Sequence, residues 1–105
     1  MSSVSPALRD AVQTWLSTRR ALKGASDNTL IAYANDVHGF LGFVAQHTGG
    51  ETGLIALTSL TITDMRAWMA SLRREELTSR SIARKLSSVK SFFRWLGERE
   101  GFEAT

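Results

Sequence analysis

TSRSIARKLSSVKSFFRWLGER, residues 78–99, carries apolar side chains at alternating steps of four and three. They are Ile82, Leu86, Val89, Phe93 and Leu96. At about 100° per residue these side chains fall on one stripe of an α-helix. The opposite side carries Arg80, Arg84, Ser87 and Ser91, flanked by Lys85, Lys90 and Arg94. Five cations and no acid lie between Thr78 and Leu96. The stretch therefore predicts a helix with one side for a core and the other for a negatively charged partner, with nucleic acid as the first candidate.

Two long helices are expected ahead of this one, near the start of the chain. The first covers about residues 5–22 and begins with Ser5-Pro6, a capping side chain followed by a proline in the first turn. Gly24 is its expected stop. The second covers about residues 27–47 and begins with Ser26-Asp27, a cap followed by an acid.

A glycine-rich loop over residues 48–53 separates these helices from the second half of the chain. Residues 54–60 are expected to pack on the core as an irregular segment, with a short strand as the alternative. A third helix is expected from about Thr63 to Glu76, capped by Thr63 and Asp64. Thr78 or Ser79 then caps the last helix after a break of two or three residues. The pattern predicts an all-α fold.

The core is expected where the apolar stripes of these helices meet. The stripes are Leu8, Val12, Trp15, Arg19 and Leu22 on the first helix, Leu30, Ala34, Val37, Leu41 and Val44 on the second, and Met65, Trp68, Met69 and Leu72 on the third. Two glycines in the second helix, Gly39 and Gly42, suggest a close helix crossing. Phe92 and Trp95 lie off the stripe of the last helix, and core packing is the favoured interpretation for both.

Composition limits the possible functions. The 105 residues suit one small domain and contain no cysteine, which excludes a disulfide framework and a thiolate metal site. His38 and His47 have no second ligand at helical spacing, so no metal or cofactor is expected. Neither a signal peptide nor a membrane span is apparent, and a cytoplasmic protein is expected. No catalytic constellation or phosphate loop is evident, which argues against an enzyme.

The start of the last helix lacks an acid, whereas the second and third helices begin with Asp27 and Asp64 and the first has Asp10 soon after its start. Its first turn is Ser79-Arg80-Ser81-Ile82, whose cation opposes the helix dipole. A bound phosphate would satisfy the free N–H groups, the hydroxyls and Arg80 together. The alternative is an exposed arginine that solvent screens.

Two motifs carry a family resemblance. Ser26-x-Asn28-Thr29-x-x-x-Tyr33-x-x-Asp36-Val37 resembles the second-helix signature of the N-terminal core-binding domain of tyrosine site-specific recombinases. The stretch from Leu77 to Phe93 resembles the fourth-helix signature of that family, and Leu60–Asp64 supplies the helix start between the two. The similarity is greatest to the Xer-type chromosome-dimer resolvases and phage integrases.

The resemblance implies a four-helix, orthogonal SAM-like bundle that forms a single DNA-binding domain over residues 1–105. In this family the domain is one half of a clamp around duplex DNA, and its second and fourth helices approach the major groove. The nucleophilic tyrosine belongs to a later catalytic domain, so this chain is expected to bind DNA without cutting it. The implied partners are duplex DNA and other recombinase subunits, in a tetramer on DNA. Where the family commonly has arginines, this chain has Ala34 and Asn35.

The resemblance and the polar faces together give the candidate DNA-binding residues. They are Ser26, Asn28, Thr29, Tyr33 and Asn35 on the second helix, and Ser79, Arg80, Ser81, Arg84, Lys85, Ser87, Lys90 and Ser91 on the last. For each, the alternative is an ordinary solvated side chain. The alternative for the whole chain is a helical protein-interaction module that docks a partner through Trp95 or Phe102. The sequence does not distinguish chromosome-dimer resolution from mobile-element integration.

Overall fold

The computed structural model describes residues 4–49 and 53–101, and these residues form α-helices joined by short connections. The helices are α1 (Pro6–Lys23), α2 (Asp27–Thr48), α3 (Leu54–Thr58), α4 (Ile62–Arg74) and α5 (Ser79–Glu100). The all-α prediction is confirmed, with four long helices at the expected places. One more helix, α3, is a single short turn. An irregular segment or a short strand was expected there.

The helix ends follow the capping signals with one correction. Ser5, Ser26 and Thr78 each accept a hydrogen bond from a backbone N–H in the first turn of α1, α2 and α5. The cap of α4 is Thr61, whereas Thr63 was expected. Thr61 and Asp64 form a capping box, in which each side chain accepts a hydrogen bond from the other residue's backbone N–H. Asp64 is therefore the third residue of α4 and not a residue at its very start, as had been predicted.

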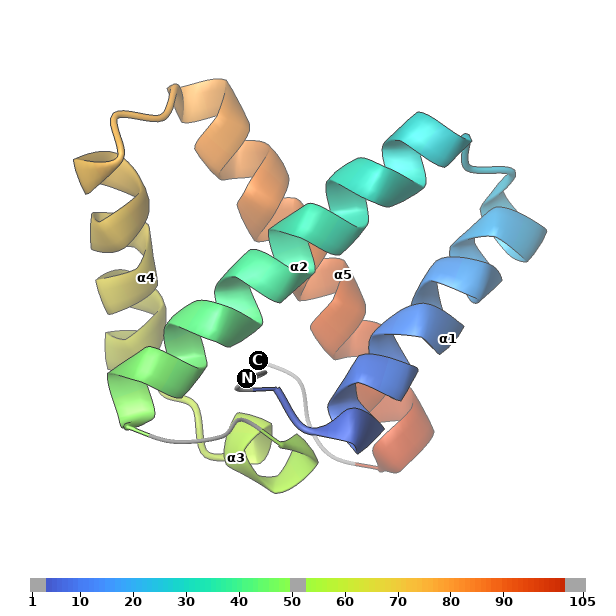
Figure 1. Cartoon of the computed structure of the whole chain (residues 1–105), viewed down its shortest axis with the longest axis horizontal. Helices are drawn as coiled ribbons and strands as arrows, with labels where there is room; N and C mark the ends of the chain where they lie inside the picture. Colours follow the sequence, from blue (N-terminus) through green and yellow to red (C-terminus); the bar gives the residue numbers. More distant parts are fainter. Residues whose placement is uncertain (1–3, 50–52, 102–105) are drawn as a thin grey trace.

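α2 crosses α5 near the middle of the molecule, with α1 on one side and α4 on the other (Figure 1). α2 and α5 both begin at the same end of the molecule, the upper edge in this view. The core lies between these helices. Its largest fully buried side chains are Trp15, Phe40 and Phe92, whose rings meet neighbouring rings edge to face. The prediction that Phe92 belongs to the core is confirmed.

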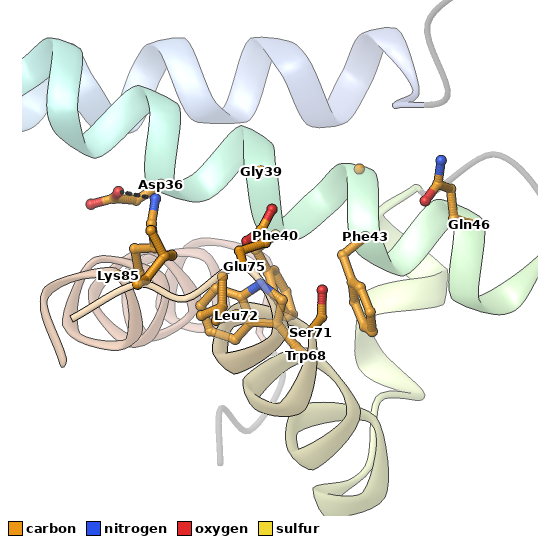
Figure 2. Close-up of a pocket in the computed structure, with 12 residues that line it drawn as sticks. Asp36, Gly39, Phe40, Phe43, Gln46, Trp68, Ser71, Leu72, Glu75 and Lys85 are labelled. Carbon is orange, nitrogen blue, oxygen red and sulfur yellow. Dashed lines mark hydrogen bonds and ion pairs between the residues drawn. The ribbon is translucent and has the colours of Figure 1, made fainter. Parts of the chain in front are cut away.

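Two expectations about packing are wrong. Leu22 was assigned to the core, but in the last turn of α1 it is 76% exposed. Gly39 and Gly42 were assigned to a close helix crossing, but a Cβ atom built on either residue would meet no atom within 4 Å. Both glycines instead line an open cavity of about 590 Å³ between α2 and α4. Phe40, Phe43 and Trp68 give this cavity an aromatic wall (Figure 2).

Candidate nucleic-acid interface

The outer face of α5 is basic. Five exposed residues follow one another at steps of three and four: Arg80, Ala83, Ser87, Lys90 and Arg94. Within the described part of the chain, the three cations of this set form no ion pair with an acid. At about 100° per residue these positions span roughly 80° of the helix circumference. We call them the α5 stripe.

Arg84 was expected to face outward beside Arg80, but it is held by a carboxylate of α2. Its Nε donates to Oδ2 of Asp36 over 3.2 Å, and its Nη2 donates to Oδ1 over 2.8 Å. The Arg84 side chain remains 50% exposed, whereas the Asp36 side chain is fully buried. No periodicity within the helix predicts this contact, which restrains Arg84 from the protein side. That Arg84 binds DNA stays a prediction.

Two more residues of α5 complete the shell around Asp36. Lys85 Nζ donates to Oδ1 over 3.2 Å, and the buried Ser88 hydroxyl donates to Oδ2 over 2.9 Å. Lys85 and Asp36 lie together at one end of the cavity in Figure 2. Both oxygens of Asp36 thus receive two hydrogen bonds each, all from one neighbouring helix.

The pKa of Asp36 reflects two opposing effects. Burial alone raises the pKa, because it disfavours the charged carboxylate. The hydrogen bonds from Arg84 and its neighbours, together with the positive charge of Lys85, outweigh burial and hold the pKa below its ordinary value. The carboxylate is therefore ionised at neutral pH, and its charge offsets one of the two nearby cations.

Ser91 and Tyr33, two further candidates, hold an arginine of α1. Arg19 Nη1 donates to Oγ of Ser91 over 3.1 Å, and its guanidinium carbon lies 5.3 Å from the Tyr33 ring centroid. The same guanidinium lies 5.8 Å from the ring of Trp15. Arg19 thus joins α1 to both α2 and α5. Ser91 and the ring face of Tyr33 are partly occupied within the fold.

The remaining candidates lie at the two helix starts. Ser26 caps α2 and donates its hydroxyl to Thr29 Oγ1 over 2.9 Å. Asn28 and Asn35 are exposed on α2, and Ser79 is exposed on α5. Ser81 is half-buried, and its backbone N–H is satisfied by Thr78. Asp27, beside the start of α2, forms an ion pair with Arg20. The structure thus spreads the candidates over a wide arc of α5 and over the first three turns of α2, and it turns Lys85 and Ser91 towards neighbouring helices.

Sequence reasoning missed Asp36 and Ser88 as the residues that organise this region. A signal for Asp36 was present. It is the only acid between Asn28 and Thr48, while the last helix carries five cations and no acid from Ser79 to Leu96. Ser88 gave no such signal, because serine is common on solvated helix faces.

The family model described as "Phage integrase, N-terminal SAM-like domain" matches residues 12–100. This chain belongs to that family. The SAM-like, all-α fold expected from the sequence is thereby confirmed.

Proteins named "Tyrosine recombinase XerC" are similar to this SAM-like domain along most of its length. The protein from Bradyrhizobium diazoefficiens is 37% identical over 96% of this chain and 31% of its own length. The one from Rhodospirillum centenum is 38% identical over 91% of this chain and 28% of its own length. The chain thus spans about a third of the relatives it matches. No solved structure matches it significantly.

In the described residues, no helix is long and apolar enough to cross a membrane. Neither histidine needs a metal to explain its position. His47 Nε2 lies 3.1 Å from Oδ1 of Asp64, which ties the end of α2 to the first turn of α4. His38 is partly buried, and burial together with the charge of Arg9 lowers its pKa.

Proposed function

We propose that this chain is the duplex-DNA-binding domain of a tyrosine recombinase, and that it approaches DNA through α2 and α5. The observation that carries the proposal is the α5 stripe, with three exposed cations and no acid. A groove lined with phosphates attracts such a face, and an α-helix fits the major groove. Membership of the integrase family and similarity to recombinases support the same assignment.

The proposed contacts divide between the two helices by chemistry. α5 contributes charge through Arg80, Lys90 and Arg94. Arg84 is half exposed beside them, and Lys85 is held further back by Asp36. After Asp27, whose charge is paired with Arg20, the outward positions in the first half of α2 are uncharged, so Asn28 and Asn35 contribute hydrogen bonds. The other proposed contacts are hydroxyl groups, those of Ser26, Thr29, Ser79, Ser81 and Ser87. Tyr33 and Ser91 would act partly through Arg19, which both of them contact.

The catalytic step is proposed to lie outside this domain. Tyr33 is the only tyrosine in the chain, and its ring packs against Trp15 at 5.9 Å within the bundle. We propose that residues 1–105 act as one DNA-binding unit of a recombinase that carries its nucleophile elsewhere. Other subunits of the same recombinase are its proposed partners on DNA.

Fluorescence anisotropy with a labelled duplex across a salt series tests the proposal. We expect affinity to fall linearly with salt on a log–log plot. Replacing Arg80, Lys90 and Arg94 together by alanine should reduce the slope by up to about 3, because each phosphate that the protein no longer neutralises lowers it by roughly 0.9.

The matched control is Arg66→Ala. Arg66 is an exposed cation on α4, away from the α5 stripe, with no ion pair among the described residues. This variant should keep the wild-type slope. Absence of duplex binding at low salt, or equal losses in both variants, would count against the proposal.

A further inference from the structure

The contact between Arg84 and Asp36 uses two N–H donors of the guanidinium and leaves the others unused. A guanidinium carries five N–H donors in a planar fork. Asp36 takes one from Nε and one from Nη2. Three N–H groups remain, two on Nη1 and one on Nη2. One N–H of Nη1 and the remaining N–H of Nη2 form a second fork along the adjacent edge of the same plane. A fork of this kind matches two acceptors lying side by side.

Exposure makes this second fork available. The Arg84 side chain is 50% exposed, and no acceptor other than Asp36 contacts it within the described residues. The Asp36 side chain is fully buried beneath it. An approaching anion therefore meets the guanidinium before it meets the carboxylate. Because Arg84 and Lys85 share a single acid, the cluster keeps a net positive charge.

We infer that Asp36 is a positioning residue, which fixes the guanidinium of Arg84 so that its free fork faces paired acceptors on duplex DNA. This inference rests on the proposed function. The acceptors are either O6 and N7 of a guanine or two oxygens of a phosphate, which share the same side-by-side geometry. A free arginine loses rotamer freedom when it binds. An arginine already held by Asp36 loses less, which corresponds to about a two- to tenfold gain in affinity.

Lys85 and Ser88 also contact Asp36, but neither presents a free fork of N–H donors to DNA. The Lys85 side chain is only 22% exposed and lines the cavity beside α2 (Figure 2). Ser88 is buried and presents nothing to solvent. Ser88→Ala is therefore a matched control, since it removes one hydrogen bond to Asp36 and leaves the Arg84 fork in place.

A double-mutant cycle separates positioning from stability. It compares wild type, Asp36→Asn, Arg84→Ala and the double variant for binding to a fluorescein-labelled duplex of mixed sequence. All are measured at a temperature where circular dichroism shows each of them folded. We expect Asp36→Asn to weaken binding about two- to tenfold in the wild-type background and to have no further effect once Arg84 is alanine. Ser88→Ala should bind within about twofold of wild type.

The inference is overturned if Asp36→Asn weakens binding by the same factor in both backgrounds, or if Arg84→Ala binds like wild type. Arg84→Lys gives a second test should Asp36→Asn not fold. Lysine keeps the charge but has no fork, so we expect weaker binding than wild type, and equal binding would contradict the fork. If the wild type itself does not bind duplex DNA, the proposed function is wrong.

Two further arms identify the acceptor. A phosphate contact predicts that Arg84→Ala lowers the salt slope by about 0.9. A guanine contact predicts that replacing guanine by 7-deazaguanine, which lacks N7, weakens wild type but not Arg84→Ala. If neither change depends on Arg84, its fork is not used and the inference fails.

Discussion

At the scale of single residues, the contact between Arg84 and Asp36 means that replacing Arg84 should change the stability of the fold as well as DNA binding. A cation that only binds DNA is dispensable for folding, whereas one that satisfies a buried carboxylate is not. Arg84→Ala removes two charge-assisted hydrogen bonds to Asp36. We expect it to lower the free energy of unfolding by about 1.5–3 kcal/mol, measured by urea denaturation.

Arg94→Ala is the matched control on the same helix. Arg94 is exposed and has no ion pair among the described residues, so its replacement should change stability by less than about 0.5 kcal/mol. Equally small effects in the two variants would show that Asp36 does not depend on Arg84.

Asp36 also predicts a specific response to acid. Its pKa is lowered in the folded state, so it stabilises the fold above the ordinary carboxyl pKa of about 3.9. That contribution is lost as pH falls from this value through the folded-state pKa. Wild type should exceed Asp36→Asn in unfolding free energy at neutral pH, and the difference should shrink below about pH 4. A difference that stays constant down to about pH 2 would contradict this assignment.

At the scale of helices, the structure changes the expected effect of replacing the glycines of α2 by alanine. A close helix crossing, as expected from the sequence, would make alanine destabilising. Gly39 and Gly42 are helical, and an added Cβ meets nothing within 4 Å at either position. Alanine should therefore stabilise α2 by up to about 1 kcal/mol at each site, seen as a higher thermal midpoint. Gly24→Ala is the control and should destabilise, because Gly24 ends α1 with a φ of +63°. A loss of stability at Gly39 would restore the idea of a close helix crossing.

The start of α4 offers a second test at this scale. Thr61 is the cap, and its side chain accepts a hydrogen bond from the backbone N–H of Asp64. Thr61→Ala should cost about 1 kcal/mol of stability, since it breaks the capping box. Thr63→Ala should cost much less, because Thr63 is exposed in the first turn and caps nothing. Chemical denaturation of the two variants decides between the observed cap and the one expected from sequence.

At the scale of the whole molecule, the sequence was informative where local rules act. Helical periodicity and capping placed α1, α2 and α5 within one or two residues, because those signals lie within each helix. The burial of Asp36 depends on where α2 crosses α5, which no pattern within one helix records. The same holds for Arg84 and Ser91, which periodicity placed outward but which reach Asp36 of α2 and Arg19 of α1.

The arrangement of the helices makes one surface the proposed binding face. α2 and α5 begin at the same end of the molecule (Figure 1), and Asp36 of α2 contacts Arg84 of α5 where the two helices meet. We propose that duplex DNA approaches the two helices from this end. α4, with the exposed cation Arg66, flanks this pair. The central claim is that duplex DNA contacts α2 and α5 rather than another part of the bundle.

Amide chemical-shift mapping during titration with a short duplex tests that claim most directly. We predict shifts concentrated in the first half of α2, from Ser26 to Asn35, and along α5 from Ser79 to Arg94. Shifts centred on the outer side of α4 around Arg66, or no shifts at low salt, would contradict it.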